Sequence, residues 1–540
     1  MSIAALGAAA LAAIPLLSVG VLALGENQGS WHHLFANILP GSVLTTLILV
    51  IGVGLVTAGI GLPCAWLVSR HAFTGRNVLH WFAVMPLAIP TYVAAYCYVE
   101  LLDYTGPVQS LLRQLGGFAS RRDYAFPEIR SLPGAIVVMS LVLYPYVYLT
   151  ARLVFEMQGA RVIESARILG ASGLRLFFAI ALPLARPAIM AGSALAMMEA
   201  LNDIGAVEIL GIRTLTFSIF DTWLNRSSLA GAAQIACVLL ILVAMLLAME
   251  RRARGDKQYH DKGSPAAAPR AQVGRVKLHG WKAAGAFAIC VLPPAAGFAI
   301  PVLALAGYAA QRLDQVADPA LWSALGNSLA VAISTAIITV IAALLLLSAQ
   351  RMDRSPLTRL CVRVAGLGYA APGTVLALGA LYAFAGFDNS LDSFLREHFN
   401  VSTGLLVSGS MAIIIFVCSV RFLAIAQGAI ESGYSRISPH LSMAAQTLGK
   451  SRFGAAVLVE LPLMKTTLAT AGLLVFVDTM KELSATVLLR PFNFQTLATF
   501  VYERASRALF EDAAMAALVI VIVGVLPVIL LSRTPERGQR

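Results

Sequence analysis

Long apolar runs separated by short polar segments dominate the chain from end to end. A run of about 20 apolar residues is long enough to cross the hydrocarbon core of a bilayer, which is roughly 30 Å thick. The sequence contains twelve such runs, and we interpret each as a transmembrane helix. They lie at about 3–24, 43–69, 80–101, 135–155, 185–210, 229–249, 282–310, 328–349, 362–385, 405–427, 465–488 and 513–532. The pattern predicts an all-α, polytopic membrane protein.

Composition and charge support this prediction. Hydrophobic residues make up 58% of the chain and charged residues only 13%, whereas roughly 25% of an ordinary soluble domain is charged. The first run has no Lys or Arg before it, unlike a signal peptide, so we keep it as a span. With the N-terminus inside, 28 of the 40 Lys and Arg residues fall in cytoplasmic segments. The positive-inside rule therefore supports twelve spans with both termini cytoplasmic, and no nucleic-acid partner is needed to explain the net charge of +12.

The chain also repeats itself. The residue numbers of Gly170 and Gly449 differ by 279, and so do those of Pro183 and Pro462. Each half holds six spans, an even number, so the two halves have the same orientation and are related by an axis along the membrane normal. The segment between them is basic and rich in Pro, Gly and Ala, as is typical of a linker. We predict three parts: a first half of six spans (1–249), a cytoplasmic linker (250–281) and a second half of six spans (282–540).

A charged, amphipathic segment interrupts the apolar runs once in each half, at 164–189 and at 443–468. In the first copy, charged and apolar residues alternate with the period of a short helix, which Gly170 can end in a left-handed conformation. Ser172 is then placed to cap a second short helix, which Pro183 separates from the next span. We call these bent segments the first and second knuckle. A membrane-surface helix is the simpler alternative, but two matched copies favour docking elements for a duplicated partner.

The spacing of both knuckles resembles the EAA loop of permeases from binding-protein-dependent ABC importers. In that family the loop is the coupling helix that docks on the ATPase subunits. This chain departs from the pattern at Ser165, which replaces an alanine, and at Met443, which stands in place of a glutamate. The second knuckle is therefore expected to dock with one polar contact fewer. The matching residues are Glu164, Ala166, Gly170 and Pro183 in the first knuckle, and Ala445, Gly449 and Pro462 in the second.

This resemblance implies the type I ABC importer permease fold and two copies of an ATPase subunit as partners. The partner subunits hydrolyse the ATP, so this chain is expected to bind no cofactor and to be no enzyme. Segments 201–223 and 477–505 resemble the fused, two-half ferric iron permeases, which implies ferric iron as the substrate and a periplasmic ferric-iron-binding protein as a further partner. Permeases for thiamine, polyamines and phosphonates are related and remain alternatives.

Charged residues inside the predicted spans are the other functional signal, because they are costly in a bilayer. Glu199 and Asp203 are four residues apart and so on one helical face, and Asp478 and Glu482 repeat the pair at the same offset of 279. Carboxylate oxygens suit a hard cation, so we predict that both pairs line the translocation pathway. A structural network around Lys481 is the alternative. The candidate pathway residues are Glu199, Asn202, Asp203, Asp478, Lys481 and Glu482, with no fixed metal site and no catalytic residue.

Two other functional classes fit the sequence less well. A proton-coupled secondary transporter can also have six plus six spans, but it does not need two knuckles with EAA spacing. A membrane-embedded enzyme needs a compact catalytic constellation, and the sequence contains neither a metal-ligand spacing of His, Asp and Glu nor a Ser/His pairing. We therefore expect a transport subunit.

Overall fold

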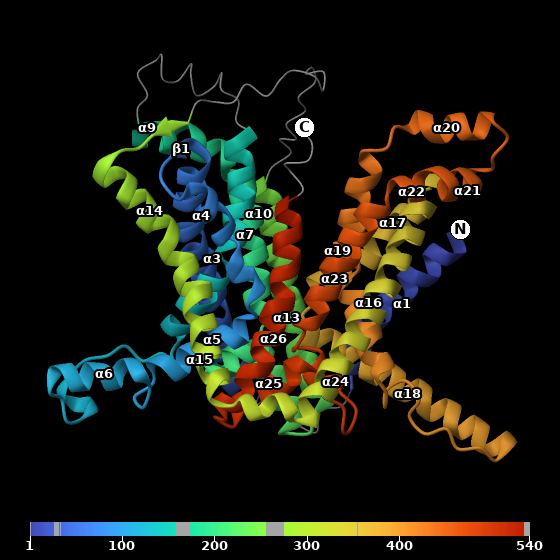
Figure 1. The fold of residues 1–540 in the computed structure, drawn as a ribbon. Helices are drawn as coiled ribbons and strands as arrows, with labels where there is room; N and C mark the ends of the chain where they lie inside the picture. Colours follow the sequence, from blue (N-terminus) through green and yellow to red (C-terminus); the bar gives the residue numbers. More distant parts are fainter. Residues whose placement is uncertain are drawn as a thin grey trace. The chain divides into compact units, whose positions relative to one another are not determined.

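A computed structural model shows that the chain is built almost entirely of helices (Figure 1). It describes residues 2–25, 32, 34–157, 173–254, 275–353 and 355–533. Within these ranges the β structure consists of two short parallel strands, β1 (His71–Ala72) and β2 (Val276–Lys277). The prediction of an all-α protein is confirmed.

The helical elements follow one another along the chain, with short 3₁₀ and π turns marked η. Those of the first half are α1 (Ser2–Ala23), η1 (Leu34–Ile38), α3 (Leu39–Arg70), α4 (Arg76–Phe82), η2 (Met85–Ala88), α5 (Thr91–Leu102), α6 (Pro107–Gly116), η3 (Arg121–Asp123), α7 (Leu132–Met157), α9 (Gly173–Leu176), η4 (Phe177–Ala181), α10 (Leu182–Asn202), α11 (Ile204–Ile209), α12 (Leu215–Leu224) and α13 (Leu229–Arg254). Those of the second half are α14 (Gly280–Pro294), η5 (Ala295–Ala299), α15 (Ile300–Gln311), η6 (Leu313–Ala317), α16 (Pro319–Met352), α17 (Pro356–Ala365), η7 (Gly366–Ala370), α18 (Gly373–Phe399), α19 (Met411–Ser435), α20 (Pro439–Thr447), α21 (Arg452–Ala455), η8 (Ala456–Glu460), α22 (Leu461–Leu463), α23 (Lys465–Met480), α24 (Thr486–Leu489), α25 (Leu497–Ser506) and α26 (Phe510–Arg533).

The local structure repeats with the sequence. The first residues of α7 and α19 are separated by the same offset of 279 that relates the two knuckles, and so are those of the π turns η4 and η8. The first residues of α12 and α25 are separated by an offset of 282. The internal duplication seen in the sequence is therefore also present in the order and length of the helices.

Among the described residues, ten helices are long and apolar enough to cross a membrane. Two further helix pairs pass the same test together but are bent, by 94° after Ala88 and by 72° after Leu463. If each bent pair counts as one span, the number rises to twelve. The chain is thus polytopic, and the twelve predicted spans correspond to ten helices and two bent pairs.

Some of the predicted spans are not continuous helices. The predicted span 80–101 is broken where Ile89 is extended (φ −93°, ψ 126°) before Pro90, because a residue before proline is disfavoured in the helical region. The predicted span 362–385 breaks in the same way, where Ala371 precedes Pro372. The predicted span 465–488 ends early because α23 stops at Met480. Apolar length alone predicted these spans, and it does not register such breaks.

The chain divides into two compact units. Unit 1 consists of Met1–Ser42, Leu215–Leu240 and Ala309–Pro527, and unit 2 of Val43–Thr214, Ile241–Tyr308 and Val528–Arg540. These units do not coincide with the two sequence halves. Helix α1 belongs to unit 1, which is mostly second half, and α14 and most of α15 belong to unit 2, which is mostly first half. The boundaries of the halves and the linker stay predictions, although α13 continues to Arg254, past the predicted start of the linker.

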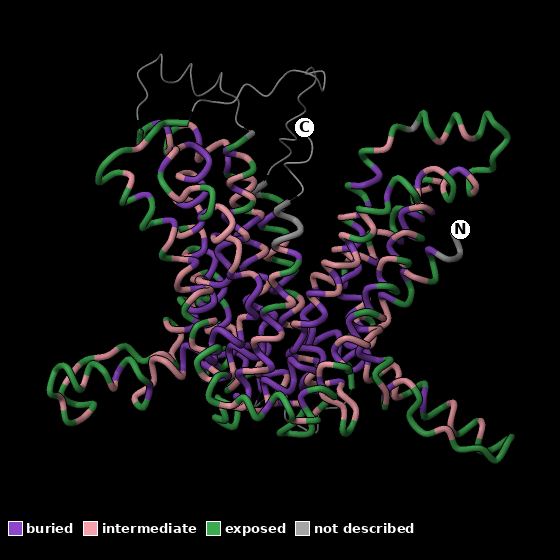
Figure 2. The backbone as a smooth tube through the Cα atoms, in the orientation of Figure 1, coloured by how far each residue is buried: buried purple, intermediate pink, exposed green. Residues whose placement is uncertain are grey.

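In unit 1, helices α16, α19 and α23 pack together, and α1 lies against α16, α17 and α18. Ala5, Ala9 and Ala12 form a buried stripe of small residues on α1, which allows close helix contact. In unit 2, α7 packs between α5 and α10, with Tyr144 and Tyr148 buried at its centre. Figure 2 shows that burial is concentrated where helices of a unit face one another, whereas the projecting α6 and the C-terminal part of α18 are largely exposed.

Candidate functional site

Asp203, the second acid of the pair in the first half, lies at a break between two helices. Helix α10 ends at Asn202, and Asp203 is extended (φ −86°, ψ 97°). Its Oδ1 accepts a hydrogen bond from the backbone N–H of Ala206 at 2.9 Å, and its Oδ2 accepts one from the hydroxyl of Thr91. Asp203 therefore caps α11 and ties it to the first residue of α5.

Glu482 occupies the position in the second half that is equivalent to Asp203. Its Oε1 accepts a hydrogen bond from the backbone N–H of Ala485 at 2.7 Å, and Ala485 is the counterpart of Ala206. Glu482 also forms an ion pair with Arg421, whose Nη1 lies 2.9 Å from Oε1 and 2.8 Å from Oε2. Both side chains are buried. A chain that breaks a helix inside a bilayer must satisfy the freed backbone N–H groups internally, and both acids do this.

The two halves surround these acids differently. Thr91 and Gly373 are the first residues of α5 and α18, and each follows a proline. A Cβ atom at residue 373 would overlap Nη1 of Arg421 and lie 3.0 Å from Oε1 of Glu482. Glycine therefore leaves the room that the guanidinium occupies. In the first half, the position equivalent to Arg421 is held by the buried Val142.

The prediction that each acidic pair shares one helical face is wrong, because each helix ends between the two acids. Glu199 is a half-buried residue of α10, whereas Asp203 lies beyond its last residue, the buried Asn202. An i, i+4 argument holds only for a continuous helix, and an Asp side chain that binds nearby backbone N–H groups favours a break.

The second pair is interrupted in the same way. Asp478 belongs to α23, Lys481 follows its last residue, and Glu482 comes after it. Lys481 Nζ lies 3.2 Å from Oδ1 of Asp478, so the acids of this pair have separate cationic partners. Arg421, which is not among the predicted pathway residues, lies buried within α19. The signal that could have identified it is its position inside an apolar stretch, where a charge requires a partner.

The second knuckle has the bent form that the sequence predicts. Helix α20 contains Ala445 and ends before Gly449, which is left-handed (φ +85°). The N–H of Lys450 donates to the carbonyl of Ala445 at 3.1 Å, and the Ser451 hydroxyl caps α21 by accepting from the N–H of Gly454 at 3.0 Å. Left-handed glycine and a capping serine reverse the chain between two short helices.

The first knuckle is described only in part. Glu164, Ala166 and Gly170 lie outside the described residues. Pro183 lies in the first turn of α10, and residues 177–202 form one helix without a break. The prediction that Pro183 separates a short helix from the span is therefore wrong. Pro183, which has no N–H to donate, directly follows the π turn η4, where the N–H of Leu182 donates five residues back to the carbonyl of Phe177, and the helix continues through this turn into α10.

In the second knuckle Pro462 lies in the short helix α22, and the 72° bend comes after it, at Met464. The two copies of the Leu-Pro motif thus share the preceding π turn but differ in the path of the chain beyond the proline. The motif alone does not decide whether the chain continues straight.

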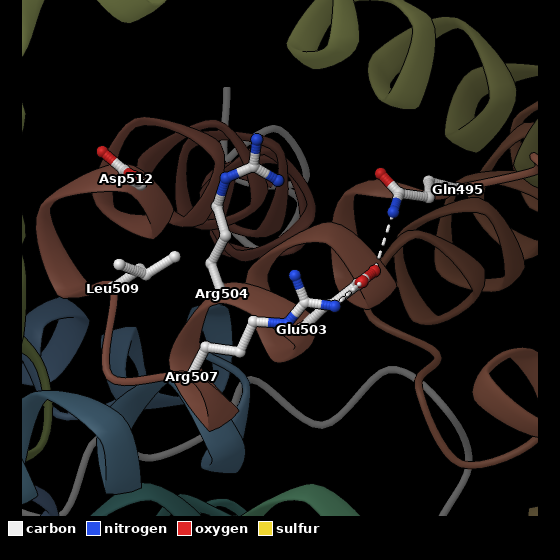
Figure 3. A pocket seen from close by; sticks show the side chains of 6 residues that line it. All are labelled: Gln495, Glu503, Arg504, Arg507, Leu509 and Asp512. Atoms are coloured by element: carbon white, nitrogen blue, oxygen red, sulfur yellow. Dashed lines mark hydrogen bonds and ion pairs between the residues drawn. The ribbon is translucent and has the colours of Figure 1, made fainter.

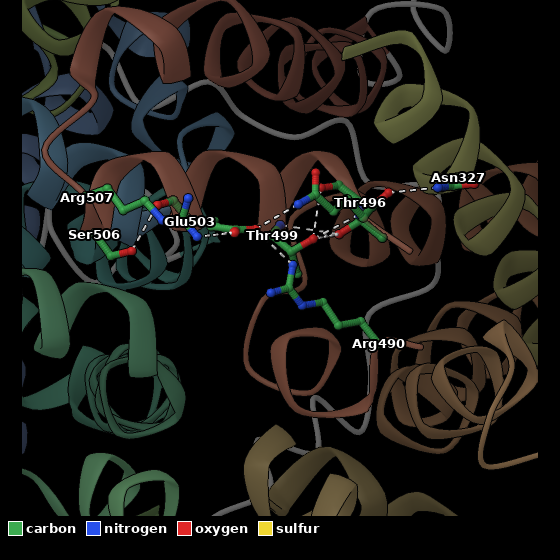
Figure 4. A network of polar contacts seen from close by, with 8 residues as sticks. Asn327, Arg490, Thr496, Thr499, Glu503, Ser506 and Arg507 are labelled. Atoms are coloured by element: carbon green, nitrogen blue, oxygen red, sulfur yellow. Dashed lines mark hydrogen bonds and ion pairs between the residues drawn. The ribbon is translucent and has the colours of Figure 1, made fainter. Parts of the chain in front are cut away.

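At the other end of unit 1, a polar network joins the α24–α25 loop to α25 (Figure 4). Glu503 is its centre: Oε2 lies 3.2 Å from Nη1 of Arg490 and accepts a hydrogen bond from Nε2 of Gln495 at 2.7 Å, and Oε1 accepts one from Nη2 of Arg507 at 2.8 Å. A pocket of about 290 Å³ beside this network is lined by both acidic and basic side chains (Figure 3).

This loop also carries an insertion. The offset between equivalent positions is 279 at Ala206 and Ala485 and 282 at Thr214 and Thr496, so the second half has three more residues between these positions than the first. Asn493 has a positive φ of 59°, and Phe492 is 96% exposed. A second pocket, of about 590 Å³, lies between this loop and the start of α16. Within the described ranges, no three His, Cys, Asp or Glu side chains are grouped to hold a metal ion.

Comparison with known proteins is consistent with this architecture. Residues 57–254 match the family described as binding-protein-dependent transport system inner membrane component. The Fe(3+)-transport system permease protein FbpB 2 of Haemophilus influenzae is 25% identical over 495 residues, which cover 90% of this chain and 88% of that protein. The sulfate transport system permease protein CysT of Salmonella typhimurium is 28% identical over 43% of this chain and 84% of its own length. The molybdenum transport system permease protein ModB of Escherichia coli is 29% identical over 34% of this chain and 80% of its own length.

The predicted resemblance to ABC importer permeases is confirmed by these matches. The chain resembles a fused, two-half permease, because the match to the ferric iron protein extends over nearly all of both chains.

Proposed function

We propose that this ABC importer permease carries ferric iron across the inner membrane to the cytoplasm. The single observation that supports iron is the length of the match: the ferric iron permease aligns with 90% of this chain, whereas the sulfate and molybdenum permeases align with 43% and 34%. Iron is then cargo that passes through, and not a resident cofactor.

The partners in this proposal are two copies of an ATPase subunit and a periplasmic ferric-iron-binding protein. The family description supports a binding-protein-dependent system. Two observations support two ATPase docking sites. The residues around Gly449 are exposed, and the sequence around Gly170 repeats theirs. Hydrolysis of ATP is assigned to the partner, so this chain acts as the transport subunit. Exposed aromatic residues are common anchors of interfaces, and Phe492 is a candidate anchor for the binding protein.

That the six candidate residues line the translocation pathway remains a proposal, and the hydrogen bonds of the acids favour different roles for them. Asp203 and Glu482 each cap a helix break, which favours a structural role for their carboxylates. Glu199 and Asp478 are less buried and are better placed to meet a passing ion, with Asn202 and Lys481 beside them. We expect the Glu199→Gln, Asp478→Asn double variant to insert normally but to transport iron more slowly, because two hard oxygen ligands lose their charge.

A specific observation favours oxyanions as the second candidate substrate, since sulfate and molybdenum permeases match parts of the chain. Thiamine, polyamines and phosphonates, suggested by the family resemblance, are further alternatives. The test is uptake into proteoliposomes that contain this chain, the ATPase and the binding protein encoded beside it. We expect radiolabelled ferric iron to accumulate with ATP, and sulfate and molybdate to stay outside. Oxyanion uptake without iron uptake would show that the substrate assignment is wrong and leave the permease assignment intact.

The orientation of the chain is a further prediction. A reporter fused after Arg254 should be cytoplasmic and one fused after Ser120 should be periplasmic, because basic residues concentrate on the proposed cytoplasmic side. Alkaline phosphatase and green fluorescent protein fusions measure the two locations. A cytoplasmic reporter at Ser120 would contradict the arrangement of spans in the first half.

The loop 102–134 departs from the positive-inside rule, because it carries four arginines on the proposed outer side. Two of them have acidic partners in the structure: Arg121 lies 3.2 Å from Glu128, and Arg130 lies 3.7 Å from Asp103. Paired charges weaken the positive bias of the loop, so the proposed orientation is compatible with its composition.

A further inference from the structure

A buried carboxylate connects the second knuckle to the rest of unit 1. Glu460 is the last residue of the π turn η8 and is 8% exposed. Its Oε1 accepts a hydrogen bond from the hydroxyl of Ser442 in α20. The same oxygen lies 3.4 Å from Nη2 of Arg351, near the C-terminal end of α16. One carboxylate oxygen thus joins the knuckle helix to a long helix of unit 1.

The connection continues from Arg351 into α19. The guanidinium carbon of Arg351 lies 4.4 Å from the centre of the Tyr434 ring, a distance typical of a cation–π contact. The hydroxyl of Tyr434 lies 3.0 Å from Oγ of Ser348, one turn earlier on α16. Four elements (α16, α19, α20 and η8) therefore meet in one polar cluster, which we call the Glu460 cluster: Ser348, Arg351, Tyr434, Ser442 and Glu460.

Helix α20 is only weakly packed against the rest of unit 1. Of its residues 440–447, six are exposed and two, Ser442 and Ala445, are half-buried. A nine-residue helix is too short to be stable in water by itself, and residues 440–447 present no buried apolar face. The hydrogen bond from Ser442 to Glu460 is therefore a main attachment of α20 to the unit.

The first half uses different chemistry at the equivalent positions. The counterparts of Glu460 and Tyr434 there are Ala181 and Phe155. Phe155 packs edge-on against Trp66, with ring centres 5.3 Å apart, and Trp66 lies 5.2 Å from the ring of Phe177. The base of the first knuckle thus contains aromatic rings where the second has a charged cluster.

We infer that Glu460 is a positioning residue, whose carboxylate holds α20 at the angle from which the second knuckle transmits ATPase movement to the spans. The inference rests on the proposed function for the partner, and on the Glu460 cluster for the residue. Met443 stands where the EAA loop has a glutamate, and the neighbouring Ser442 contacts the carboxylate of Glu460, which lies 18 residues further along the chain in η8. The carboxylate that contacts α20 in the second knuckle therefore comes from η8.

Amide hydrogen exchange of the full chain in lipid nanodiscs tests the attachment without any partner. We expect Glu460→Gln to increase exchange over residues 439–448 by about tenfold, because a charge-assisted hydrogen bond is replaced by a neutral one. Ser442→Ala, which removes the donor, should produce at least a similar increase, and adding Glu460→Gln to it should change little more, since both changes act on the same hydrogen bond. Glu431→Gln is the matched control. It removes an exposed carboxylate from the C-terminal end of α19, near Tyr434 in sequence, and should leave the exchange over residues 439–448 unchanged.

A second measurement separates positioning from mere structure. In proteoliposomes with the ATPase and iron-loaded binding protein, Glu460→Gln should lower the ratio of iron transported to ATP hydrolysed by about three- to tenfold. Membrane insertion should be normal, and Glu460→Asp should restore part of the ratio, because the charge returns at a shorter reach.

If amide hydrogen exchange over residues 439–448 is as slow in Glu460→Gln as in the unchanged protein, the inference is overturned, whatever the assembly transports. Faster exchange with an unchanged transport ratio would also overturn it, because the contact would then be structural alone. If the proposed function itself is wrong, the result is distinguishable, because the assembly with the unchanged protein would also hydrolyse ATP without transporting iron.

Discussion

Replacing Arg421 with methionine should lower the free energy of unfolding of the protein by about 3–5 kcal/mol, because Glu482 would remain buried with its charge unmatched. The two side chains are 8% and 5% exposed, and one guanidinium nitrogen contacts both carboxylate oxygens. Titration with SDS in mixed micelles measures the difference. Glu482→Gln should be similarly costly, since it leaves the arginine buried and weakens the cap on Ala485.

The double variant Arg421→Met, Glu482→Gln should be more stable than the sum of the two single losses predicts, by about 0.5–3 kcal/mol, because neither buried charge then remains. Arg396→Met is the matched control. Arg396 lies 2.7 Å from Asp392 but is 63% exposed, and exposed pairs contribute at most about 1 kcal/mol. If Arg421→Met costs no more than Arg396→Met, the buried pair does not stabilise unit 1.

Gly449→Val should abolish most coupling between ATP hydrolysis and transport through the second knuckle. The φ of +85° at Gly449 is strained for any residue with a Cβ, at a cost of roughly 1–2 kcal/mol, and more for a β-branched side chain. No atom lies within 4 Å of a Cβ at this position, so the cost is conformational and not steric. We expect ligand-stimulated ATPase activity to fall by about tenfold, and further when Gly170→Val is added.

Two control variants separate backbone conformation from side-chain size. Gly449→Asn should retain most activity, because asparagine tolerates the left-handed region. Gly428→Val adds the same side chain at a helical glycine of α19, where a Cβ also meets nothing within 4 Å, and should be well tolerated. Normal ATPase stimulation in the Gly170→Val, Gly449→Val double variant would contradict a docking role for the knuckles.

Local features were the most predictable part of this protein. Long apolar runs predicted the helices because crossing a bilayer constrains the length and hydropathy of a segment directly. The second knuckle was equally readable, since the left-handed Gly449 and the capping Ser451 act on their own neighbours along the chain. Their repeat at one offset strengthened the prediction, because two copies rarely agree by chance.

Features that depend on distant partners could not be predicted. The break after Asn202 depends on Asp203 capping α11 and on its contact with Thr91, which belongs to a different helix. Arg421 lies inside the predicted span 405–427, where a charge requires a partner, but the sequence does not show that this partner is Glu482, 61 residues further along the chain. Spacing along the chain cannot show which side chains from different helices meet.

The packing of α1 has a consequence for how the protein is made. Helix α1 ends at Ala23, yet it packs against α16, α17 and α18, the first of which begins at Pro319. At about 5–20 residues per second, a ribosome needs about 15–60 s to reach α16 after completing α1. During this delay the buried alanine stripe of α1 has none of these partners, so the helix must persist in the bilayer by its own hydropathy. If the chain were cut in the predicted linker, neither fragment would contain all the helices of one unit, and the two fragments would have to assemble before either unit was complete.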